Sequence, residues 1–385
     1  MKADTPYTEV QRTAPEPEVQ LTVITVCWNA LEALKPTVES VLGQKAKGSI
    51  SIEHVVVDGA STDGTPEWLA EQLAAGRIEQ YVSEPDRGIY DAMNKGINLA
   101  RGQVLAFLNA GDRYADDVDL EECVLPICRG ETESVAAVAS FDNTPGFPYH
   151  IPDFRQPFFH ASCCHQAFFA SARAYHLFGG YDARSFKCGA DGDMICRIYY
   201  KYGEPLISDL NVVQYDTTGL STACRTTFLN ECAEVMCRHW ESIKQKSAED
   251  IDHLRMVEAI LCKHCANFLG WQERHGHAIP ETLTKLARMC NEAAELERTP
   301  RRRLVLRLLG GQYLPRLARR GKMPPGTRQL LTLCLCLCYP APDNPYTKGK
   351  EIPGGTLAQI LSAKFKGILK RAPRGKGGEF HAGSD

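Results

Sequence analysis

Apolar, strand-like runs alternate with helical patterns between Leu21 and about residue 130, and this alternation constrains the fold most strongly. The helical patterns end near Gln44, span Pro66–Ala75 and lie around Tyr90–Ala100. Strands that alternate with helices at this spacing form βαβ units and a largely parallel sheet. Ligands of such sheets bind at the carboxyl ends of the strands, so the polar residues after each run are candidate site residues. The four runs are LTVITVC (Leu21–Cys27), IEHVVVD (Ile52–Asp58), IEQYVS (Ile78–Ser83) and QVLAFLN (Gln103–Asn109).

The remainder of the chain divides into regions of different character. Between residues 141 and 222 the pattern loosens into loops, followed by the helical pattern GADGDMICRIYYKYG; beyond residue 226 the chain is mainly helical. A length of 385 residues predicts about two domains. We therefore expect a disordered leader (1–19), an α/β domain (20–225), a helical extension (226–300) and a basic, partly amphipathic and partly disordered tail (301–385).

Charge and hydropathy indicate a protein that does not cross a membrane by itself. Hydrophobic residues make up 44% of the chain and charged residues 24%, which is typical of soluble globular proteins. The apolar run LLTLCLCLC (330–338) is half of the roughly 18 residues that a spanning helix needs. From Arg301 to Arg328 the chain has nine Lys or Arg residues and no acid, interleaved with Leu and Val. This segment predicts docking on an anionic membrane surface; without interleaved aromatics it does not predict nucleic-acid binding.

The N-terminus lacks the apolar core of a signal peptide, so we expect a cytoplasmic protein. The 16 cysteines are then expected to be reduced. CKHC (262–265) and CCH (163–165) are weak zinc candidates, because neither has a second pair at finger-like spacing.

The residues after the first two runs suit a nucleotide. Asp58 ends a Val-Val-Val run and begins DGASTDGT, where a carboxylate can accept a hydrogen bond from a base or ribose. An Asx turn at Asp58, followed by a helix cap, explains the same composition. Trp28, in WNA after the first run, can stack on a base or belong to the rim of the core.

The fourth run ends in NAGD, where Asn109 and Asp112 flank Ala-Gly. Mg²⁺ and Mn²⁺ take oxygen ligands and keep places for water and phosphate, so one carboxylate can suffice when a diphosphate supplies the others. A turn that uses Asn, Gly and Asp for backbone reasons is the alternative.

A second carboxylate pair, Asp191 and Asp193, precedes an apolar helical pattern. Acidic residues in a first helical turn are favoured by the helix dipole, so capping is the simple explanation. Two acids that are one residue apart cannot both cap, and one of them, aimed at a cleft, can serve as a general base.

The order of these segments resembles that of bacterial glycosyltransferases of family 2, which have the GT-A fold. The resemblance covers residues 21 to 222, is strongest to enzymes of exopolysaccharide, colanic-acid or O-antigen synthesis, and is most specific in EPDRGIYDAMNKGI. It implies a GT-A nucleotide-diphospho-sugar transferase fold, with a mixed, mostly parallel sheet flanked by helices and, here, a mainly helical C-terminal extension. The segments that carry it are VITVCWNALEALKPTVESVLGQ, EHVVVDGASTDGT, SEPDRGIYDAMNKGINLARGQVLAFLNAGDRY, CHQAFF, GGYD and GADGDMICRIYY.

The resemblance also assigns roles by position. It places Asp191 as the catalytic base, with Asp193 as the acid that follows it, and Asp112 as the ligand of a divalent cation, Mg²⁺ or Mn²⁺. Asn109 and Gly111 stand where relatives have acids, so Asp112 is the only carboxylate left in that motif. The other expected site residues are Val26, Trp28, Asn29, Asp58, Arg87 and Asn109 for the nucleotide, and His165 and Gln166 for the donor sugar or acceptor.

The implied reaction transfers a sugar from a nucleotide-diphosphate donor, expected to be a UDP-sugar, to a hydroxyl of a glycan or lipid-linked acceptor, with inversion. Such an enzyme would work in the cytoplasm, peripherally at the inner face of the membrane. A degraded GT-A scaffold that only binds nucleotide sugar or partners is the alternative. A nucleotidyltransferase is disfavoured, because WNALEA has no phosphate-cradling glycine-rich loop.

Overall fold

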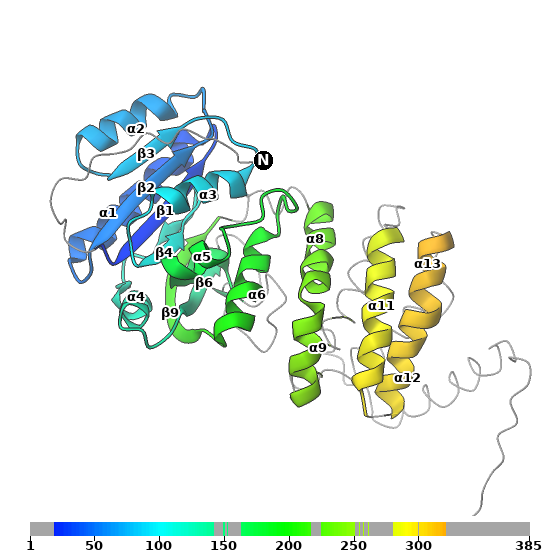
Figure 1. Cartoon of the computed structure of the whole chain (residues 1–385). Helices are drawn as coiled ribbons and strands as arrows, with labels where there is room; N and C mark the ends of the chain where they lie inside the picture. The colour runs from blue at the N-terminus through cyan, green and yellow to red at the C-terminus, as the bar shows by residue number, and fades with distance from the viewer. Residues whose placement is uncertain are drawn as a thin grey trace, which may run out of the picture.

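The computed structural model describes residues 19–141, 149–150, 152, 163–216, 225–250, 254, 257, 261, 280–298 and 300–320. They form a sheet with helices on both faces, beside which stand the helices of the C-terminal region (Figure 1). The order of the sheet is β3-β2-β1-β4-β8-β6-β9-β5, and β7 pairs with β6 outside this path. The strands are β1 (Leu21–Cys27), β2 (Ile52–Asp58), β3 (Gln80–Ser83), β4 (Val104–Phe107), β5 (Arg113–Tyr114), β6 (Ser134–Phe141), β7 (Tyr149–His150), β8 (Phe168–Ser171) and β9 (Leu206–Tyr215).

The N-terminal half of the sheet is parallel, as the alternation predicts. β1 pairs in parallel with β2 and β4, and β2 with β3. All seven residues of β1 are buried, which is expected of a central strand with helices on both faces. The register aligns Cys27 with Asp58 and Asp58 with Ser83, so the candidate residues after β1, β2 and β3 meet at one edge.

Antiparallel strands complete the sheet on the other side of β4. β8 lies antiparallel between β4 and β6, while β6 and β9 pair in parallel. β5, which directly follows the Asn109–Asp112 turn, pairs antiparallel with the end of β9. This pairing brings residues near 216 next to the turn. The sheet is mixed, and the predicted GT-A-type arrangement of sheet, flanking helices and helical C-terminal region is confirmed.

Alternate residues of the strands pack against different helices. Leu21 and Val23 of β1 belong to a cluster with α1 and α4, whereas Ile24 and Val26 belong to a cluster with α3, α5 and α6. This division follows from the two-residue period of a strand. The helices are α1 (Leu31–Lys47), α2 (Thr65–Ala74), α3 (Ile89–Leu99), α4 (Glu121–Cys128), α5 (Ala172–Leu177) and α6 (Ala190–Tyr202).

The helical region shares a core with the sheet domain. Ile195 and Ile198 of α6 lie in the same buried cluster as Val235 and Met236 of α8 and Leu286 of α11. The division into the predicted domains stays a prediction, but the described core is continuous across residue 225. The helices of this region are α8 (Arg225–Arg238), α9 (Trp240–Glu249), α11 (Pro280–Leu296), α12 (Pro300–Leu308) and α13 (Leu314–Arg320).

The described part of the basic segment is helical and its apolar side is buried. Leu306, Leu309, Leu314 and Leu317 are at most 2% exposed and belong to the core that includes α11. The expectation that these leucines face a lipid surface is therefore wrong, because they pack inside the protein. The exposed groups on these helices are arginines: Arg307, Arg316 and Arg319.

In the part of the chain that the structure describes, no helix combines the length and apolar character needed to cross a membrane. The ten cysteines described are free thiols. The leader up to residue 18, CKHC, LLTLCLCLC and the tail beyond residue 320 lie outside the described residues.

Candidate active site

Asp58 organises the loops at the carboxyl ends of β1, β2 and β3. Its side chain is fully buried, and its oxygens accept hydrogen bonds from the Ser61 N–H (3.0 Å), the Ser61 hydroxyl and the Ser83 hydroxyl (2.6 Å). Asn29 joins the same network, since its N–H donates to Ser61 Oγ at 2.6 Å and its Oδ1 accepts from Thr62 N–H at 2.8 Å. The Ser61 N–H lies three residues after Asp58, not the two of an Asx turn, so the carboxylate holds a wider bend and shapes this edge from beneath its surface.

Trp28 lies open to solvent above this edge, with 68% of its surface exposed. A Cβ atom added to Gly59 would lie 3.3 Å from Trp28 Cδ1 and 2.6 Å from Asp86 Oδ2, so these three residues are neighbours. Asp86 is fixed by the Gly88 N–H, which donates to its Oδ1 at 2.8 Å. Gly59 thus lets Trp28 and Asp86 approach its backbone closely, and together the exposed indole and the carboxylate can offer a stacking face and a hydrogen-bond acceptor to a base.

Val26 and Arg87 differ in exposure, since Val26 is buried and Arg87 lies on the surface. Val26 is 6% exposed, and its carbonyl accepts a hydrogen bond from Ala110 N–H at 3.3 Å. The Arg87 side chain is 74% exposed and pairs with Asp91 at 2.6 Å. Arg87 can therefore reach a ligand only by turning from Asp91 or by acting together with it.

The turn after β4 brings Asp112 next to a second acid that the sequence did not single out. Asp112 is 3% exposed, and its Oδ1 accepts a hydrogen bond from the Asp216 N–H at 2.9 Å. Gly111 has φ +106°, and a Cβ atom there would lie 3.1 Å from Asp216 Oδ2. The pairing of β5 with β9 thus brings the Asp216 carboxylate next to a turn in which Asn109 and Gly111 provide no carboxylate.

The surroundings of Asp112 are those of a desolvated oxygen cluster. Burial raises the pKa of Asp112 to about 7, although the Asp216 N–H and a hydrogen bond from Gln166 act in the opposite direction. The Oδ1 atom of Asn109 is buried without a hydrogen-bond partner among the described residues. Oxygen atoms of carboxylates and amides are the ligands of Mg²⁺ and Mn²⁺, so this donor set fits such a cation. No group of three or more His, Cys, Asp or Glu residues that could hold a metal occurs in the described ranges.

Asp191 lies in the first turn of α6 and contacts a tyrosine of α3. The Tyr90 hydroxyl donates a hydrogen bond to Asp191 Oδ1 at 2.8 Å. Burial, and then the Asp191 charge, raise the pKa of Tyr90 well above its ordinary value, so the phenol keeps its proton and remains a donor. Tyr90 was missed as a site residue, although it lies in the segment that resembles the family most specifically.

His165 and Gln166 begin a 3₁₀ turn (His165–Ala167) between the two acids. His165 is stacked on Phe107 and its Nε2 lies 2.7 Å from the Tyr181 hydroxyl, while Gln166 hydrogen-bonds to Asp112. Burial raises the pKa of the neighbouring Cys164 to about 12, and the charges of Asp112 and Asp191 both add to the shift. Asp112 and Asp191 therefore both lie near Cys164, the residue directly before this turn.

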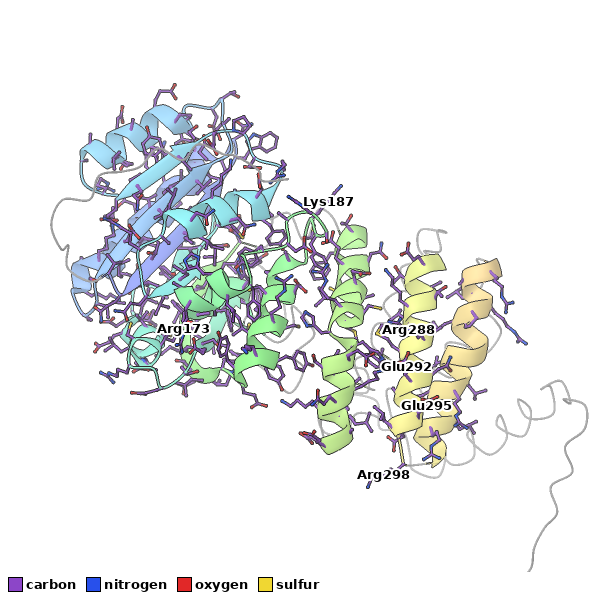
Figure 2. All side chains as sticks on the ribbon, viewed as in Figure 1. Arg173, Lys187, Arg288, Glu292, Glu295 and Arg298 are labelled. Carbon is purple, nitrogen blue, oxygen red and sulfur yellow. The ribbon has the colours of Figure 1, made fainter. Side chains whose placement is uncertain are left out.

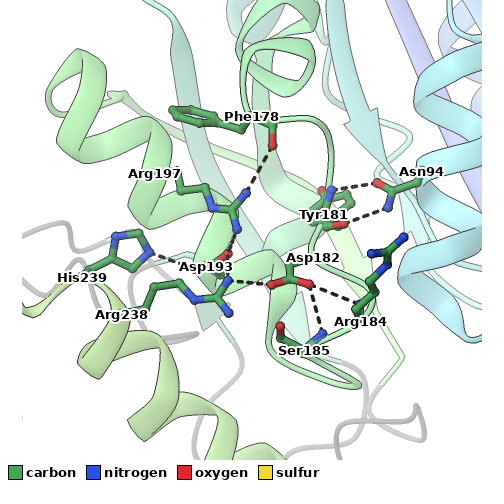
Figure 3. A network of polar contacts seen from close by, with 10 residues as sticks. All are labelled: Asn94, Phe178, Tyr181, Asp182, Arg184, Ser185, Asp193, Arg197, Arg238 and His239. Atoms are coloured by element: carbon green, nitrogen blue, oxygen red, sulfur yellow. Dashed lines mark hydrogen bonds and ion pairs between the residues drawn. The ribbon is translucent and has the colours of Figure 1, made fainter. Parts of the chain in front are cut away.

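Asp193 does not share the environment of Asp191. It is 1% exposed, and its side-chain partners in the part of the chain that the structure describes are basic residues: Arg197, Arg238 at 3.2 Å and His239 at 2.9 Å (Figure 3). Residues i and i+2 of a helix point in different directions, and here Asp193 turns toward the helical region. The predicted catalytic part for Asp193 stays a prediction, and the contacts favour a supporting role.

The mixed sheet, its flanking helices and the helical C-terminal region define a GT-A-type domain. Residues 22–188 match the model of glycosyl transferase family 2. An uncharacterised glycosyltransferase of Mycobacterium tuberculosis is 32% identical over 209 residues, which cover 52% of this chain and 77% of that protein. The chain belongs to glycosyltransferase family 2.

Two further similarities fit this assignment. A putative teichuronic acid biosynthesis glycosyltransferase of Bacillus subtilis is 35% identical over 98 residues, or 25% of this chain and 38% of that one. A crystal structure of Staphylococcus aureus TarS in complex with UDP-GlcNAc superposes with a TM-score of 0.60 at 14% identity, covering 79% of this chain and 93% of that chain. At this identity the structural similarity concerns the fold alone.

Proposed function

We propose that the protein is an inverting glycosyltransferase that moves a sugar from a nucleoside-diphosphate donor, a UDP-sugar, to a hydroxyl of a glycan or lipid-linked acceptor. The observation that supports this proposal most strongly is that Asp112 and Asp191 both lie near Cys164, directly before the turn that begins at His165, and that Gln166 of this turn hydrogen-bonds to Asp112. One acid lies at the nucleotide-facing edge, where a diphosphate would end, and the other at the wall where an acceptor would enter.

Asp191 acts as the general base. Its carboxylate takes the proton of the acceptor hydroxyl while that oxygen attacks the anomeric carbon from the face opposite the nucleotide. The bond from the anomeric carbon to the diphosphate oxygen breaks, the electron pair leaves with the diphosphate, and the configuration inverts. Tyr90 holds Oδ1 at 2.8 Å and so fixes the direction of the carboxylate.

Asp112 would hold the divalent cation, Mg²⁺ or Mn²⁺, with Asp216 as the neighbouring carboxylate and Asn109 as a neutral oxygen donor. A cation bound there supplies positive charge that offsets the charge of the leaving diphosphate, an effect typically worth several kcal/mol. Gln166 supports the site by its hydrogen bond to Asp112, and His165 anchors the turn through Tyr181.

The nucleotide lies at the edge that Asp58 shapes. Trp28 stacks on the base, Gly59 allows the close approach, and the backbone of Val26 and Asn29 lines the pocket. Arg87 is a candidate for the diphosphate once it turns from Asp91.

The test uses a panel of nucleotide sugars with the full chain, its Asp191→Asn variant and its Asp112→Ala variant. We expect UDP-sugar binding by calorimetry in all three proteins in the presence of Mn²⁺, with weaker binding in Asp112→Ala. Turnover should fall roughly 10²-fold or more in Asp191→Asn, because the base is lost. Proton NMR of the product should show an inverted anomeric configuration.

Each part of the proposal has its own contrary result. Full turnover in Asp191→Asn would remove this residue as the base, and retention of configuration would remove the inverting mechanism. Binding without turnover for every donor and acceptor would favour the scaffold that only binds nucleotide sugar. Absence of binding to any nucleotide sugar would contradict both functions.

We also propose that the described arginines of α12 and α13 contact an anionic surface, such as a cytoplasmic membrane leaflet that carries the acceptor. Because the leucines of these helices are buried, the attraction is electrostatic and should weaken with salt. Each arginine near such a surface contributes about 1 kcal/mol. Co-sedimentation with phosphatidylglycerol vesicles should therefore decrease in Arg307→Gln and Arg316→Gln, and binding that is equal for neutral vesicles would contradict the idea.

A further inference from the structure

We propose that α8 of the helical region positions the catalytic base: Glu231, Arg238 and the adjoining His239 hold the segment 187–193, which carries Asp191. This inference rests on the proposed function, in which Asp191 is the base. None of the three residues reaches the reacting atoms, so they are positioning residues.

Glu231 holds the chain directly before α6. Its side chain is 9% exposed, and its two oxygens accept the N–H groups of Lys187 at 2.8 Å and Cys188 at 2.7 Å. A carboxylate that accepts two consecutive backbone N–H groups fixes the path of the loop, since both donors lose their partner when it moves. Figure 2 shows Lys187 on this loop beside α8.

The packing at Gly189 allows this approach. A Cβ atom at Gly189 would lie 3.0 Å from Glu231 Cβ and 3.3 Å from its Oε2. The Gly189 carbonyl also accepts the Asp193 N–H at 3.1 Å and thereby begins α6. Glu231 and the first hydrogen bond of α6 thus meet at one residue, two positions before Asp191.

At the C-terminal end of α8, Arg238 and the adjoining His239 contact Asp193, two residues after Asp191. Arg238 donates from the same nitrogen to Asp193 Oδ2 at 3.2 Å and to Asp182 Oδ2 at 2.9 Å, and His239 lies 2.9 Å from Asp193 Oδ1 (Figure 3). The Arg238 guanidinium also stands 4.6 Å from the centre of the Phe186 ring. A cation that bridges two carboxylates and covers a ring resists displacement in several directions.

The contacts of α8 with residues 187–189 and with Asp193 lie before and after Asp191 in the chain. Residues 187–189 are tied to the middle of α8 and Asp193 to its end, so a shift of α8 moves the turn that contains Asp191 relative to Tyr90 on α3. A misplacement of about 1 Å at a reacting group can lower the rate about 10²-fold without a change in substrate contacts. The arrangement gives the helical region an indirect part in the chemistry of the sheet domain, through the position of Asp191.

The test compares Glu231→Gln and Arg238→Gln with Arg288→Gln as the matched control. Arg288 is an exposed arginine of α11 (Figure 2) whose side chain pairs with Glu292 at 3.7 Å and contacts Cys237 of α8, away from residues 187–193. We expect kcat to fall 10- to 100-fold (about the effect of a small misplacement) in the first two variants. The donor KM and the dissociation constant for UDP should change less than about 3-fold, because the nucleotide edge is untouched. Arg288→Gln should match the wild type in both.

A second measurement is independent of turnover. Hydrogen exchange of the Lys187 and Cys188 amides should accelerate at least tenfold in Glu231→Gln and stay unchanged in Arg288→Gln, at a temperature where circular dichroism shows all variants folded. The conservative variant Arg238→Lys should restore part of kcat. Unchanged kcat and unchanged exchange in Glu231→Gln and Arg238→Gln would overturn the inference, whereas a wild type that neither binds nor turns over nucleotide sugars would instead overturn the proposed function.

Discussion

Two buried aspartates, Asp58 and Asp193, are held in opposite ways. Asp58 is fully buried and its partners are neutral groups, the hydroxyls of Ser61 and Ser83 and an N–H group of the same loop. Asp193 is 1% exposed and is surrounded by three cationic or basic side chains, of which Arg238 and His239 come from the helical region. The edge around Asp58 is therefore built within the sheet domain, while the surroundings of Asp193 depend in part on residues of the helical region.

The largest expected effect is the loss of stability in Asp193→Ala. Asp193→Ala leaves Arg197, Arg238 and His239 without their shared carboxylate, and breaking such a buried pair typically costs about 3–5 kcal/mol. Urea denaturation should show this loss in the free energy of unfolding. Asp209→Ala, at an exposed position of β9, is the control and should stay within about 0.5 kcal/mol of the wild type. A loss of less than 1 kcal/mol in Asp193→Ala would contradict the comparison.

Asp58→Ala should have a smaller effect, because the groups it leaves unbonded are neutral. A buried donor without a partner costs about 1–3 kcal/mol, and part of this cost disappears as Ser61 and Ser83 turn to other acceptors. Ser83→Ala, which removes one donor and leaves the rest of the network, should cost about 1 kcal/mol or less in the same denaturation assay. If Asp58→Ala were the more damaging of the two aspartate variants, the ranking of the two regions would be reversed.

Trp28→Ala should affect binding and not stability, since this side chain is 68% exposed. Stacking of a base on an aromatic ring contributes about 1–3 kcal/mol, so the dissociation constant for UDP should rise about tenfold or more. Calorimetry measures this change, and Trp28→Phe should restore most of the affinity. An unchanged dissociation constant would remove Trp28 from the nucleotide site.

At neutral pH the smallest effect is that of His54 of β2, a buried histidine whose protonation matters only in acid. Its Nε2 lies 2.9 Å from Thr25 Oγ1, and burial lowers the pKa of His54 to about 3. In the unfolded chain His54 takes up a proton near pH 6.5, whereas in the folded chain it stays neutral until about pH 3. The stability contributed by neutral His54 is therefore fully present above pH 6.5 and is lost as pH falls toward 3.

Within that window the contribution of His54 to the free energy of unfolding should fall by about 1.4 kcal/mol per pH unit. Urea denaturation at pH 6 and pH 5 measures the slope for the whole protein. His54→Gln should reduce this slope relative to the wild type, and an identical slope in both proteins would show that His54 titrates normally.

Local elements were predictable from the sequence. The runs Leu21–Cys27 and Ile52–Asp58 are strands with the expected bounds, and the helix expected around Tyr90–Ala100 spans Ile89–Leu99. These elements depend on hydrophobic period and on turn residues, which the sequence displays directly. Parallel pairing of these strands also predicts that their carboxyl ends, with Cys27, Asp58 and Ser83, meet at one edge of the sheet.

The contacts between distant residues were not predictable. Asp216 reaches Asp112 because β5 pairs with β9, and Asp193 faces Arg238 because α8 packs beside α6. Hydrophobic period shows which side of a helix is buried but not which later helix covers it. The basic segment illustrates the same limit, since its leucines predicted a lipid-facing surface and instead pack in the core that includes α11.

The contact of α8 with residues 187–193 has a consequence for synthesis of the protein. α8 is itself tied to α11, where Thr282 donates to Asn230 at 2.9 Å and Lys285 pairs with Glu234. A ribosome needs roughly 5–20 s to add the approximately 100 residues between Asp191 and the end of α11. During that interval the edge around Asp58 can already form while residues 187–193 lack their support, so under the proposed function a nascent or prematurely terminated chain would be unable to catalyse the transfer.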